Sequence, residues 1–353
     1  MPHHPLSCSQ AQAALAEIDS LATAFDEAYE EAVKTRNLSQ ARTLLTELEL
    51  KVATLREGLV SPLERELNLK EQYASQRDIL AKNGMLERLP SGEQGITGID
   101  GKKYPIPSYE VIRGVMQEKR GMLEKKASQG FTKLLLVPFG MELDDMKGRY
   151  GAALVRHHTE GKLFAAKEKD SDPDVPLPLD TNTPVWAWDQ YASADVNGKL
   201  VYDPKEFSAN HGGRTKTELL QEGKAWRVSF VESDPIIPRE GRGKEIGGRK
   251  QIEANQTPRD YLRATGNGIQ DHESGTTPED WLIEAMTLLE EKNQVLDDYQ
   301  GNGSVSYQTG AYFSGSGNVP SAYWSRGVQR ARLGRSDPTP RDVNFGARSA
   351  VRV

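Results

Sequence analysis

Three short patterns in the sequence contain residue types that could carry out chemistry. Residues 210–213 (NHGG) resemble the histidine–glycine turn that supplies oxyanion donors in some hydrolases, but no G-x-S-x-G nucleophile turn accompanies them. His157 and His158 are adjacent, so on a helix they point in different directions and cannot grip a metal together. Residues 241–248 contain glycines and a lysine without the order of a phosphate loop. We therefore expect a helix-surface histidine pair and a flexible basic loop.

Other chemistry-bearing residues are sparse or unsuitably placed. The acidic pairs at 144–145 and 297–298 are of a kind that usually faces water, and they support no assignment. Cys8 is the only cysteine, which excludes an internal disulfide and a cysteine-based metal cluster. The tail has no dense carboxylate loop of the kind that binds calcium. The sequence predicts no enzyme, no catalytic residue, no cofactor and no metal ion.

The last fifty residues differ in composition from the remainder of the chain. The 353-residue chain has a net charge of −6, yet residues 304–353 contain seven arginines, two aspartates and neither lysine nor glutamate, which gives this tail +5. Tyrosine, tryptophan and arginine occur there among many small residues, a mixture typical of binding surfaces. A ligand-binding face is the first interpretation. The alternative is a nucleic-acid-binding module that uses the interleaved aromatic and basic residues.

Four motifs in the tail carry a resemblance to a known family: GAYF at 310–313, VPSAYW at 319–324, LGR at 333–335 and the closing GARSAVRV. By these motifs the chain resembles the variable proteins of diversity-generating retroelements, whose C-terminal C-type-lectin fold is related to that of formylglycine-generating enzymes. The resemblance implies a receptor-like binder of an unknown ligand, expected to be a protein, with a variable region at about 319–350. The cysteine-based oxidation of the related enzymes is not expected, because Cys8 lies outside this domain.

In that family, adenine-directed substitutions rewrite the end of the gene while the scaffold is retained. Tryptophan is not produced from an asparagine codon in this way, so the resemblance implies that Trp324 is scaffold, and Gln329 departs from the simplest account. If residues 319–330 are extended, alternate residues from Ser321 to Gln329 share one face and those from Ala322 to Val328 share the other. The first face is the candidate for diversity.

The complete set of candidate variable ligand-binding residues is Ser321, Tyr323, Ser325, Gly327, Val328, Gln329, Arg330, Arg332, Ser336, Thr339, Val343, Asn344 and Phe345. The candidate scaffold residues are Trp324, Gly334, Arg335, Gly346 and Arg348. Residues 333–335, 337–338 and 341–342 are predicted to form turns and salt bridges, because proline and glycine fix turns and arginine forks onto carboxylates.

The elements that position this tail are of mixed type. Apolar residues at heptad spacing predict helices from Leu15 to Ala32 and from Ala41 to Leu59, with a break at 37–39. A third helix is expected from its Ser61 cap to 83–84. We expect a helical hairpin or bundle over 1–90, with an oligomerising coiled coil as the alternative and homo-oligomers as its consequence.

Residues 91–130 are predicted to form a linker with a hairpin at 92–107 and a helix at 109–126. The C-type-lectin-like domain is expected over 131–353, with long loops between its elements. Its strands are predicted at 131–138, 185–188, 199–202, 225–231, 304–313 and 349–353, and its helices at 142–158 and from the Thr277 cap to Leu289. The fold class is therefore α+β, an N-terminal helical bundle or coiled coil followed by this mixed domain.

Neither a secretory signal nor a membrane span is predicted. The N-terminus lacks a basic region followed by a long apolar run, and no stretch approaches the roughly 18 apolar residues of a membrane helix. The default expectation is a cytoplasmic protein, with surface display by another route left open.

Overall fold

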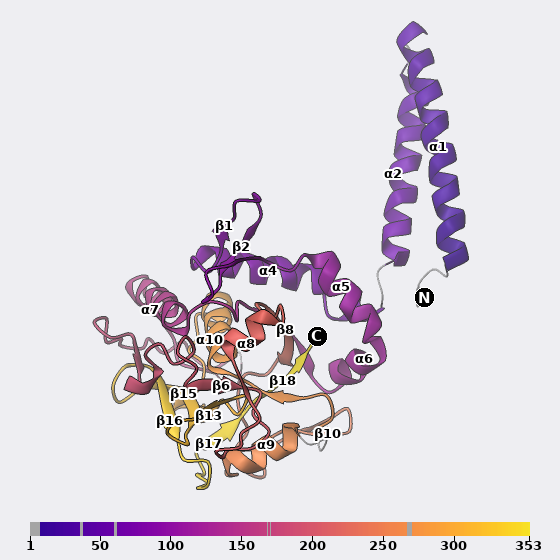
Figure 1. Ribbon diagram of the computed structural model, residues 1–353. Helices are drawn as coiled ribbons and strands as arrows, with labels where there is room; N and C mark the ends of the chain where they lie inside the picture. Colours follow the sequence, from indigo (N-terminus) through magenta and orange to yellow (C-terminus); the bar gives the residue numbers. More distant parts are fainter. Residues whose placement is uncertain (1–7, 36–37, 60–61, 168, 170, 267–269) are drawn as a thin grey trace. The chain divides into compact units, whose positions relative to one another are not determined.

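The computed structural model describes residues 8–35, 38–59, 62–167, 169, 171–266 and 270–353. The architecture is mixed α+β, as predicted (Figure 1). The chain divides into two compact units, Met1–Leu69 and Lys70–Val353. Residues 70–90, which the sequence analysis grouped with the N-terminal helices, belong to the larger unit. The side chain of Gln76 fixes them there, because its amide donates to Thr287 Oγ1 at 3.0 Å and accepts from the Leu136 N–H at 3.3 Å.

The smaller unit is built on a helical hairpin, which confirms the two predicted N-terminal helices. Its helices are α1 (Cys8–Thr35), α2 (Ser39–Leu59) and the short α3 (Pro62–Glu66). An ion pair of 2.6 Å between Lys51 and Glu17 links α1 to α2. The predicted third helix is interrupted because Asn68 has a φ of 51°, a left-handed conformation that asparagine tolerates. Its proposed cap Ser61 and the start of the break at 37 lie outside the described residues.

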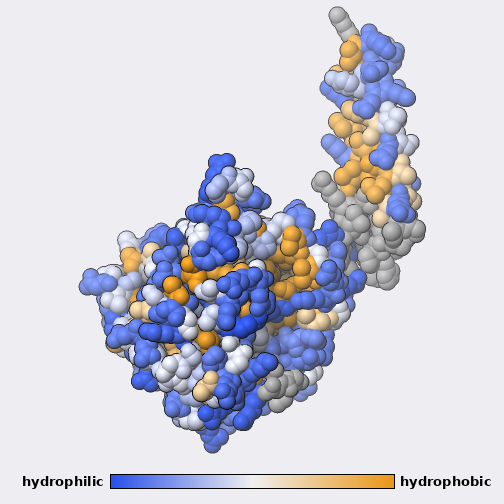
Figure 2. Space-filling model, viewed as in Figure 1, coloured by the Kyte–Doolittle hydropathy of each residue, from blue (hydrophilic) through white to orange (hydrophobic). Residues whose placement is uncertain are grey.

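The hairpin buries only one stripe of each helix. Ala32 and Ala41 are buried, whereas the predicted seam residues Leu15 and Tyr29 are about half exposed, at 50% and 51%. Figure 2 shows apolar side chains at the surface of this hairpin. Two helices can cover only one face of each other, so these exposed side chains need no further explanation in a single chain. Association with a second copy stays a prediction.

The larger unit contains the remaining helices and all of the strands of the described chain. Its helices are α4 (Leu69–Lys82), α5 (Tyr109–Glu118), α6 (Arg120–Ser128), α7 (Leu143–Thr159), the 3-10 helix η1 (Asp189–Tyr191), α8 (Lys216–Gln221), α9 (Pro258–Gly266) and α10 (Pro278–Lys292). The predicted helix at 109–126 is two helices, because Lys119 leaves the helical conformation with a ψ of 16°.

The first ten strands are divided between small sheets and the two largest sheets. They are β1 (Glu87–Arg88), β2 (Gln94–Thr97), β3 (Lys103–Pro105), β4 (Phe131–Val137), β5 (Val185–Ala187), β6 (Leu200–Tyr202), β7 (Arg214–Thr215), β8 (Arg227–Glu232), β9 (Glu245–Ile246) and β10 (Arg249–Lys250). The predicted hairpin at 92–107 is β2 and β3, with Gly101 in the left-handed region at a φ of 75°. The predicted strands at 131–138, 185–188, 199–202 and 225–231 correspond to β4, β5, β6 and β8.

The strands after residue 270 complete the two main sheets. They are β11 (Ser274–Gly275), β12 (Asp298–Tyr299), β13 (Val305–Tyr307), β14 (Ala311–Phe313), β15 (Val319–Ser325), β16 (Arg330–Ser336), β17 (Phe345–Ala347) and β18 (Ser349–Arg352). One sheet has the order β11-β18-β8-β4, so β18 lies inside it, as predicted for this segment. The other has the order β17-β13-β15-β16-β5, with β12 also paired to β15. The single strand predicted at 304–313 is two strands in different sheets, since β14 pairs with β6.

Helix α10 forms the centre of the larger unit. It begins where predicted, because the Thr277 hydroxyl accepts from the Asp280 N–H and the Asp280 carboxylate accepts from the Thr277 N–H. Every residue from Pro278 to Leu289 is buried. The helix contacts α7, β4 and β15, and the Trp281 ring meets Tyr150 edge to face at 5.9 Å. Both main sheets are therefore anchored to one helix.

Two negative findings apply to the described residues. Each of their helices falls short of the length or the apolar character that a membrane crossing requires. Among the same residues, no three histidine, cysteine, aspartate or glutamate side chains gather in the way that a metal ion needs.

Replacing Gly346 in β17 by alanine tests how tightly this strand packs against Ile237. A methyl group at this position would overlap Cγ2 of the buried Ile237, whereas a methyl group at Gly327 meets no atom within 4 Å. We expect Gly346→Ala to lower the free energy of unfolding by about 1–3 kcal/mol and Gly327→Ala to change it by about 0.5 kcal/mol or less. Urea unfolding of both variants measures this; equal effects would contradict the packing described.

Candidate ligand-binding face

The segment richest in predicted site residues is an antiparallel hairpin of β15 and β16. Ser321 lies opposite Gly334, Tyr323 opposite Arg332 and Ser325 opposite Arg330. Directly opposed residues of paired strands project to the same side of a sheet. The predicted common face of residues 321, 323 and 325 is thus confirmed, and the structure adds Arg330 and Arg332 to it. Ala322 and Trp324 occupy the other side and are fully buried.

Four side chains form a continuous row across the outer side of this sheet. Trp186 of β5 lies beside Arg332, whose guanidinium carbon is 4.3 Å from the indole ring. The same carbon is 5.7 Å from the ring of Tyr323, which meets Tyr299 of β12 edge to face at 5.5 Å. All four side chains are half-buried, so each keeps a surface open to solvent. We call Trp186, Arg332, Tyr323 and Tyr299 the aromatic row.

The arginines around the aromatic row differ in how their charge is neutralised. Arg330 forms an ion pair of 3.1 Å with Asp180, and Arg326 forks onto Asp298 with bonds of 2.8 and 2.7 Å. Arg332 has no carboxylate partner among the described residues, and its buried Nε has no hydrogen-bond partner there. The row therefore presents one aromatic-stacked cation whose charge is not compensated by the chain around it.

The extended segment predicted over 319–330 is wrong at its second half. The strand ends at Ser325, and the chain reverses through residues 326–329, where Gln329 adopts a φ of 54°. Gly327, Val328 and Gln329 are therefore exposed at the tip of the hairpin and do not continue either face of the strand. Ser321 and Ser325 point to the predicted side but are only 2% and 9% exposed, so they support the face from beneath.

The remaining candidate variable residues lie away from the row. Ser336 ends β16, four residues and thus about 13 Å along the strand from Arg332. Thr339 and Val343 are exposed in the following loop, where Asp337 and Asp342 accept backbone N–H groups at 2.8 Å, as turn-forming aspartates do.

The last two variable candidates, Asn344 and Phe345, contact other residues of the domain. Asn344 accepts a hydrogen bond of 2.9 Å from Arg239, and the ring of Phe345 packs 5.1 Å from that of the buried Tyr307. The structure thus places Tyr323 and Arg332 in the row, residues 327–329 at the hairpin tip, and residues 339–344 in the loop with Phe345 at the start of β17, while Ser321, Ser325, Arg330 and Ser336 lie in the strands outside the row.

The predicted scaffold residues are largely internal. Trp324 is 1% exposed, and Arg348 forks onto the buried carboxylate of Asp297 with bonds of 2.6 and 2.7 Å. Residues 333–335 are wrongly predicted as a turn, since all three lie in β16. A Cβ on Gly334 would come within 3.1 Å of Ser321 Oγ. Arg335 is exposed and, among the described residues, does not pair with a carboxylate as predicted. Its guanidinium carbon lies 4.9 Å from the Trp188 ring, and it donates to Asn318 at 3.1 Å.

The carboxylates that hold the tail are the ones that sequence reasoning set aside. Asp297 and Asp298 were expected to face water, yet they are 3% and 0% exposed and each binds a tail arginine. Asp297 Oδ2 also accepts from Trp281 Nε1 at 2.8 Å, and its backbone oxygen accepts from the Trp324 N–H at 2.9 Å. Both aspartates follow the end of the predicted helix. This position was the signal in the sequence that they are not a pair on a helix surface.

Two of the three chemistry-bearing patterns of the sequence have structural roles. His157 is buried, with Nδ1 3.1 Å from Asn293 Oδ1, so a surface pair was the wrong expectation. The 241–248 segment is a structured turn and hairpin, because the Glu253 carboxylate accepts from the N–H groups of Gly241 and Gly243. A carboxylate thus occupies the donors that a phosphate would need.

Comparisons with protein-family models, with curated proteins and with solved structures found no match to this chain.

The buried cluster around Arg348 predicts an unusual dependence of stability on pH. Glu284 Oε1 lies 3.4 Å from Arg348 Nε, while its other carboxylate oxygen is buried without a partner among the described residues. Burial raises the pKa of Glu284 to about 7, although Arg348 opposes the shift. A carboxyl group whose pKa is raised on folding stabilises the protein fully below its unfolded pKa and loses that contribution as the pH rises through 7.

We therefore expect the Glu284→Gln variant to be less sensitive to pH than the parent chain. From pH 5 to pH 8, the unfolding free energy of the parent should fall by about 2–3 kcal/mol more than that of the variant. Urea titrations at both pH values measure it, with Glu245→Gln in the exposed β9 strand as the control. An unchanged difference would show that Glu284 does not titrate in this range.

Proposed function

We propose that this chain is a ligand-binding protein of the variable-protein type, in which a C-type-lectin-like scaffold displays a diversified surface. The aromatic row and the hairpin tip at 326–329 form that surface. Both the tail motifs and the arrangement of candidate residues support the proposal. Recognition, and not catalysis, is the role assigned to this face.

The single observation that carries the proposal is the uncompensated Arg332 inside the aromatic row. Half-buried aromatic rings give a large contact area at low entropic loss, and a stacked arginine offers fixed donors for carboxylates. The neighbouring Arg326 and Arg330 already have acidic partners. The ligand that this surface fits is therefore a protein that places an acidic group against Arg332 and apolar groups against the rings.

The organisation of the larger unit supports the scaffold part of the proposal. The tail enters both main sheets, with β18 between β11 and β8 and with β15 between β13 and β16. Buried aspartates on the preceding segment fix Arg326 and Arg348. Tyr323 and Arg332 are half-buried on the outer side, so substitutions there should leave the contacts of Ala322 and Trp324 on the inner side unchanged.

Nucleic-acid binding is the alternative, and the charge argument for it weakens in the structure. Four of the seven tail arginines, Arg326, Arg330, Arg348 and Arg352, form ion pairs within the chain. A phosphate backbone would need those charges to be free. Binding to generic single-stranded DNA that weakens steeply with added salt would favour this alternative over the protein ligand.

The genetic proposal is tested by sequencing the region beside the gene. We expect a reverse-transcriptase gene and a near-copy of the segment encoding residues 319–350, with differences at template adenines. The differences should fall in codons for Tyr323, Arg332 and the hairpin tip, and they should spare Trp324 and Arg348, whose side chains are internal. A flanking region without a near-copy repeat would overturn the retroelement origin.

The division between display and scaffold is tested by two adjacent substitutions. Trp324→Ala removes a fully buried ring and should lower the free energy of unfolding by about 3–5 kcal/mol. Tyr323→Ala, on the solvent side, should lower it by about 1 kcal/mol or less. Chemical unfolding of the two variants gives the comparison. A Tyr323→Ala loss as large as that of Trp324→Ala would place Tyr323 in the scaffold.

A further inference from the structure

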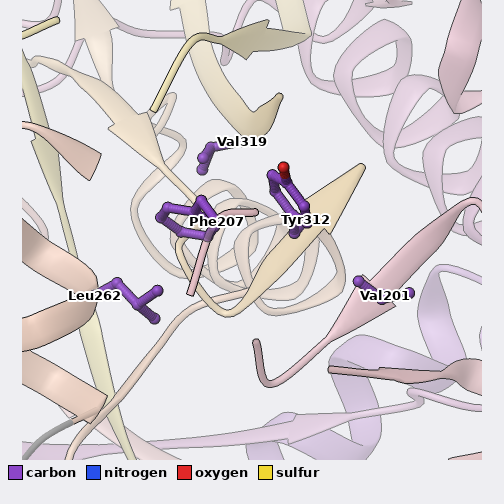
Figure 3. Close-up of a cluster of buried hydrophobic side chains, with 5 residues drawn as sticks. All are labelled: Val201, Phe207, Leu262, Tyr312 and Val319. Atoms are coloured by element: carbon purple, nitrogen blue, oxygen red, sulfur yellow. The ribbon is translucent and has the colours of Figure 1, made fainter. Parts of the chain in front are cut away.

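A second candidate site lies outside the aromatic row, beside the loop of residues 203–213. Phe207 anchors this loop in a buried cluster with Val201, Leu262, Tyr312 and Val319, which come from separate elements (Figure 3). The loop closes on itself, since the Lys205 N–H donates to the His211 oxygen at 2.7 Å and the Gly213 N–H donates to His211 Nδ1 at 3.0 Å. The loop therefore has a fixed shape, although most of its residues are polar.

A cleft of about 460 Å³ opens between this loop and helix α9. Its size lies within the usual range of small-molecule sites. Arg259 and Arg263 are four residues apart, so they lie on the same side of α9, and both line the cleft together with Lys205. Phe207 and Leu262 supply an apolar part of the wall.

The charges in this cleft are mostly uncompensated. Within the described chain, neither Lys205 nor Arg259 forms an ion pair, and Arg259 donates only a long bond of 3.5 Å to the Phe207 oxygen. Arg263 has an exposed partner in Asp260 at 3.4 Å, a type of pair that contributes little. Glu206 is the one acidic wall residue, and it accepts from Ser208 at 2.8 Å. Three cations face one carboxylate.

A second cleft of about 510 Å³ shares Lys205 and Leu262 with the first. Its wall contains Asp203, Ser274 and Thr309. The Thr309 side chain is fully buried, and its hydroxyl has no hydrogen-bond partner among the described residues. That hydroxyl faces Gly275 of the same wall, where a methyl group would overlap it. The Thr309 hydroxyl is therefore closed off from the cleft, whereas the half-buried Ser274 side chain is open to it.

We propose that these joined clefts bind a small organic phosphate that carries hydroxyl groups, such as a sugar phosphate. Arg259, Arg263 and Lys205 hold the phosphate, because guanidinium groups donate pairs of charge-assisted hydrogen bonds to its oxygens. Asp203 and Ser274 of the second cleft hold the hydroxyl groups. This site is independent of the variable face, since none of its residues belongs to the aromatic row or the hairpin tip.

The experiment is calorimetric titration of the full chain with glucose 6-phosphate, inorganic phosphate and glucose at constant ionic strength. We expect saturable binding of glucose 6-phosphate, weaker binding of phosphate and none of glucose. Arg259→Gln should weaken both phosphates about tenfold, because one charge-assisted bond is lost. Arg242→Gln, an exposed arginine outside the cleft, is the matched control and should bind as the parent does.

A separate variant tests the part of the site that binds hydroxyl groups. Ser274→Ala removes one hydroxyl group from the cleft wall and should lower the affinity for glucose 6-phosphate while leaving that for inorganic phosphate unchanged. Circular dichroism confirms that each variant is folded, and Arg263→Gln replaces Arg259→Gln if the latter is not. Failure of the parent to bind either phosphate below about 10 mM, or equal binding by parent and arginine variant, would overturn the proposal.

Discussion

The ion pair between the buried carboxylate of Asp297 and Arg348 lies where the central helix meets the C-terminal tail. The carboxylate accepts from Arg348, which lies between β17 and β18, and from the indole of Trp281 in α10. The backbone oxygen of Asp297 accepts from the N–H of Trp324 in β15. Breaking a buried pair of this kind leaves an unpaired charge and destabilises a protein by about 3–5 kcal/mol. The central helix and the junction between β17 and β18 share this dependence, because Trp281 and Arg348 both donate to the same carboxylate.

Strand β15 has one side that supports the interior and one side that faces outward. In β15, successive side chains alternate between the interior, where Ala322 and Trp324 pack, and the outer side, where Tyr323 contacts Arg332. The acidic groups of the preceding segment neutralise the arginines needed for support. Arg332 has no such partner in the described chain, and its guanidinium lies between the rings of Trp186 and Tyr323.

Much of the secondary structure could be predicted from local pattern, and the departures have physical causes. Helix α10 was predictable because its Thr277-Pro278 start and capping box are local signals. The end of β15 was not, since a hairpin turn without a strong turn signal depends on pairing with β16. The roles of Asp297 and Asp298 were also hidden, because burial of a charge depends on a distant arginine. The cluster of cations beside α9 could not be predicted either, because Lys205 and Arg259 are far apart in sequence.

The alternation of sides in β15 has a consequence for how this region can change over generations. Side chains in a strand repeat every two residues, so inserting or deleting a single residue between Val319 and Ser325 would exchange the two sides. Tyr323 would then be forced inward and Trp324 outward. A substitution keeps this alternation, whereas an insertion or deletion of an odd number of residues exchanges the two sides. Pairing with β16 thus constrains the number of residues in β15 more strictly than the identity of its outer side chains.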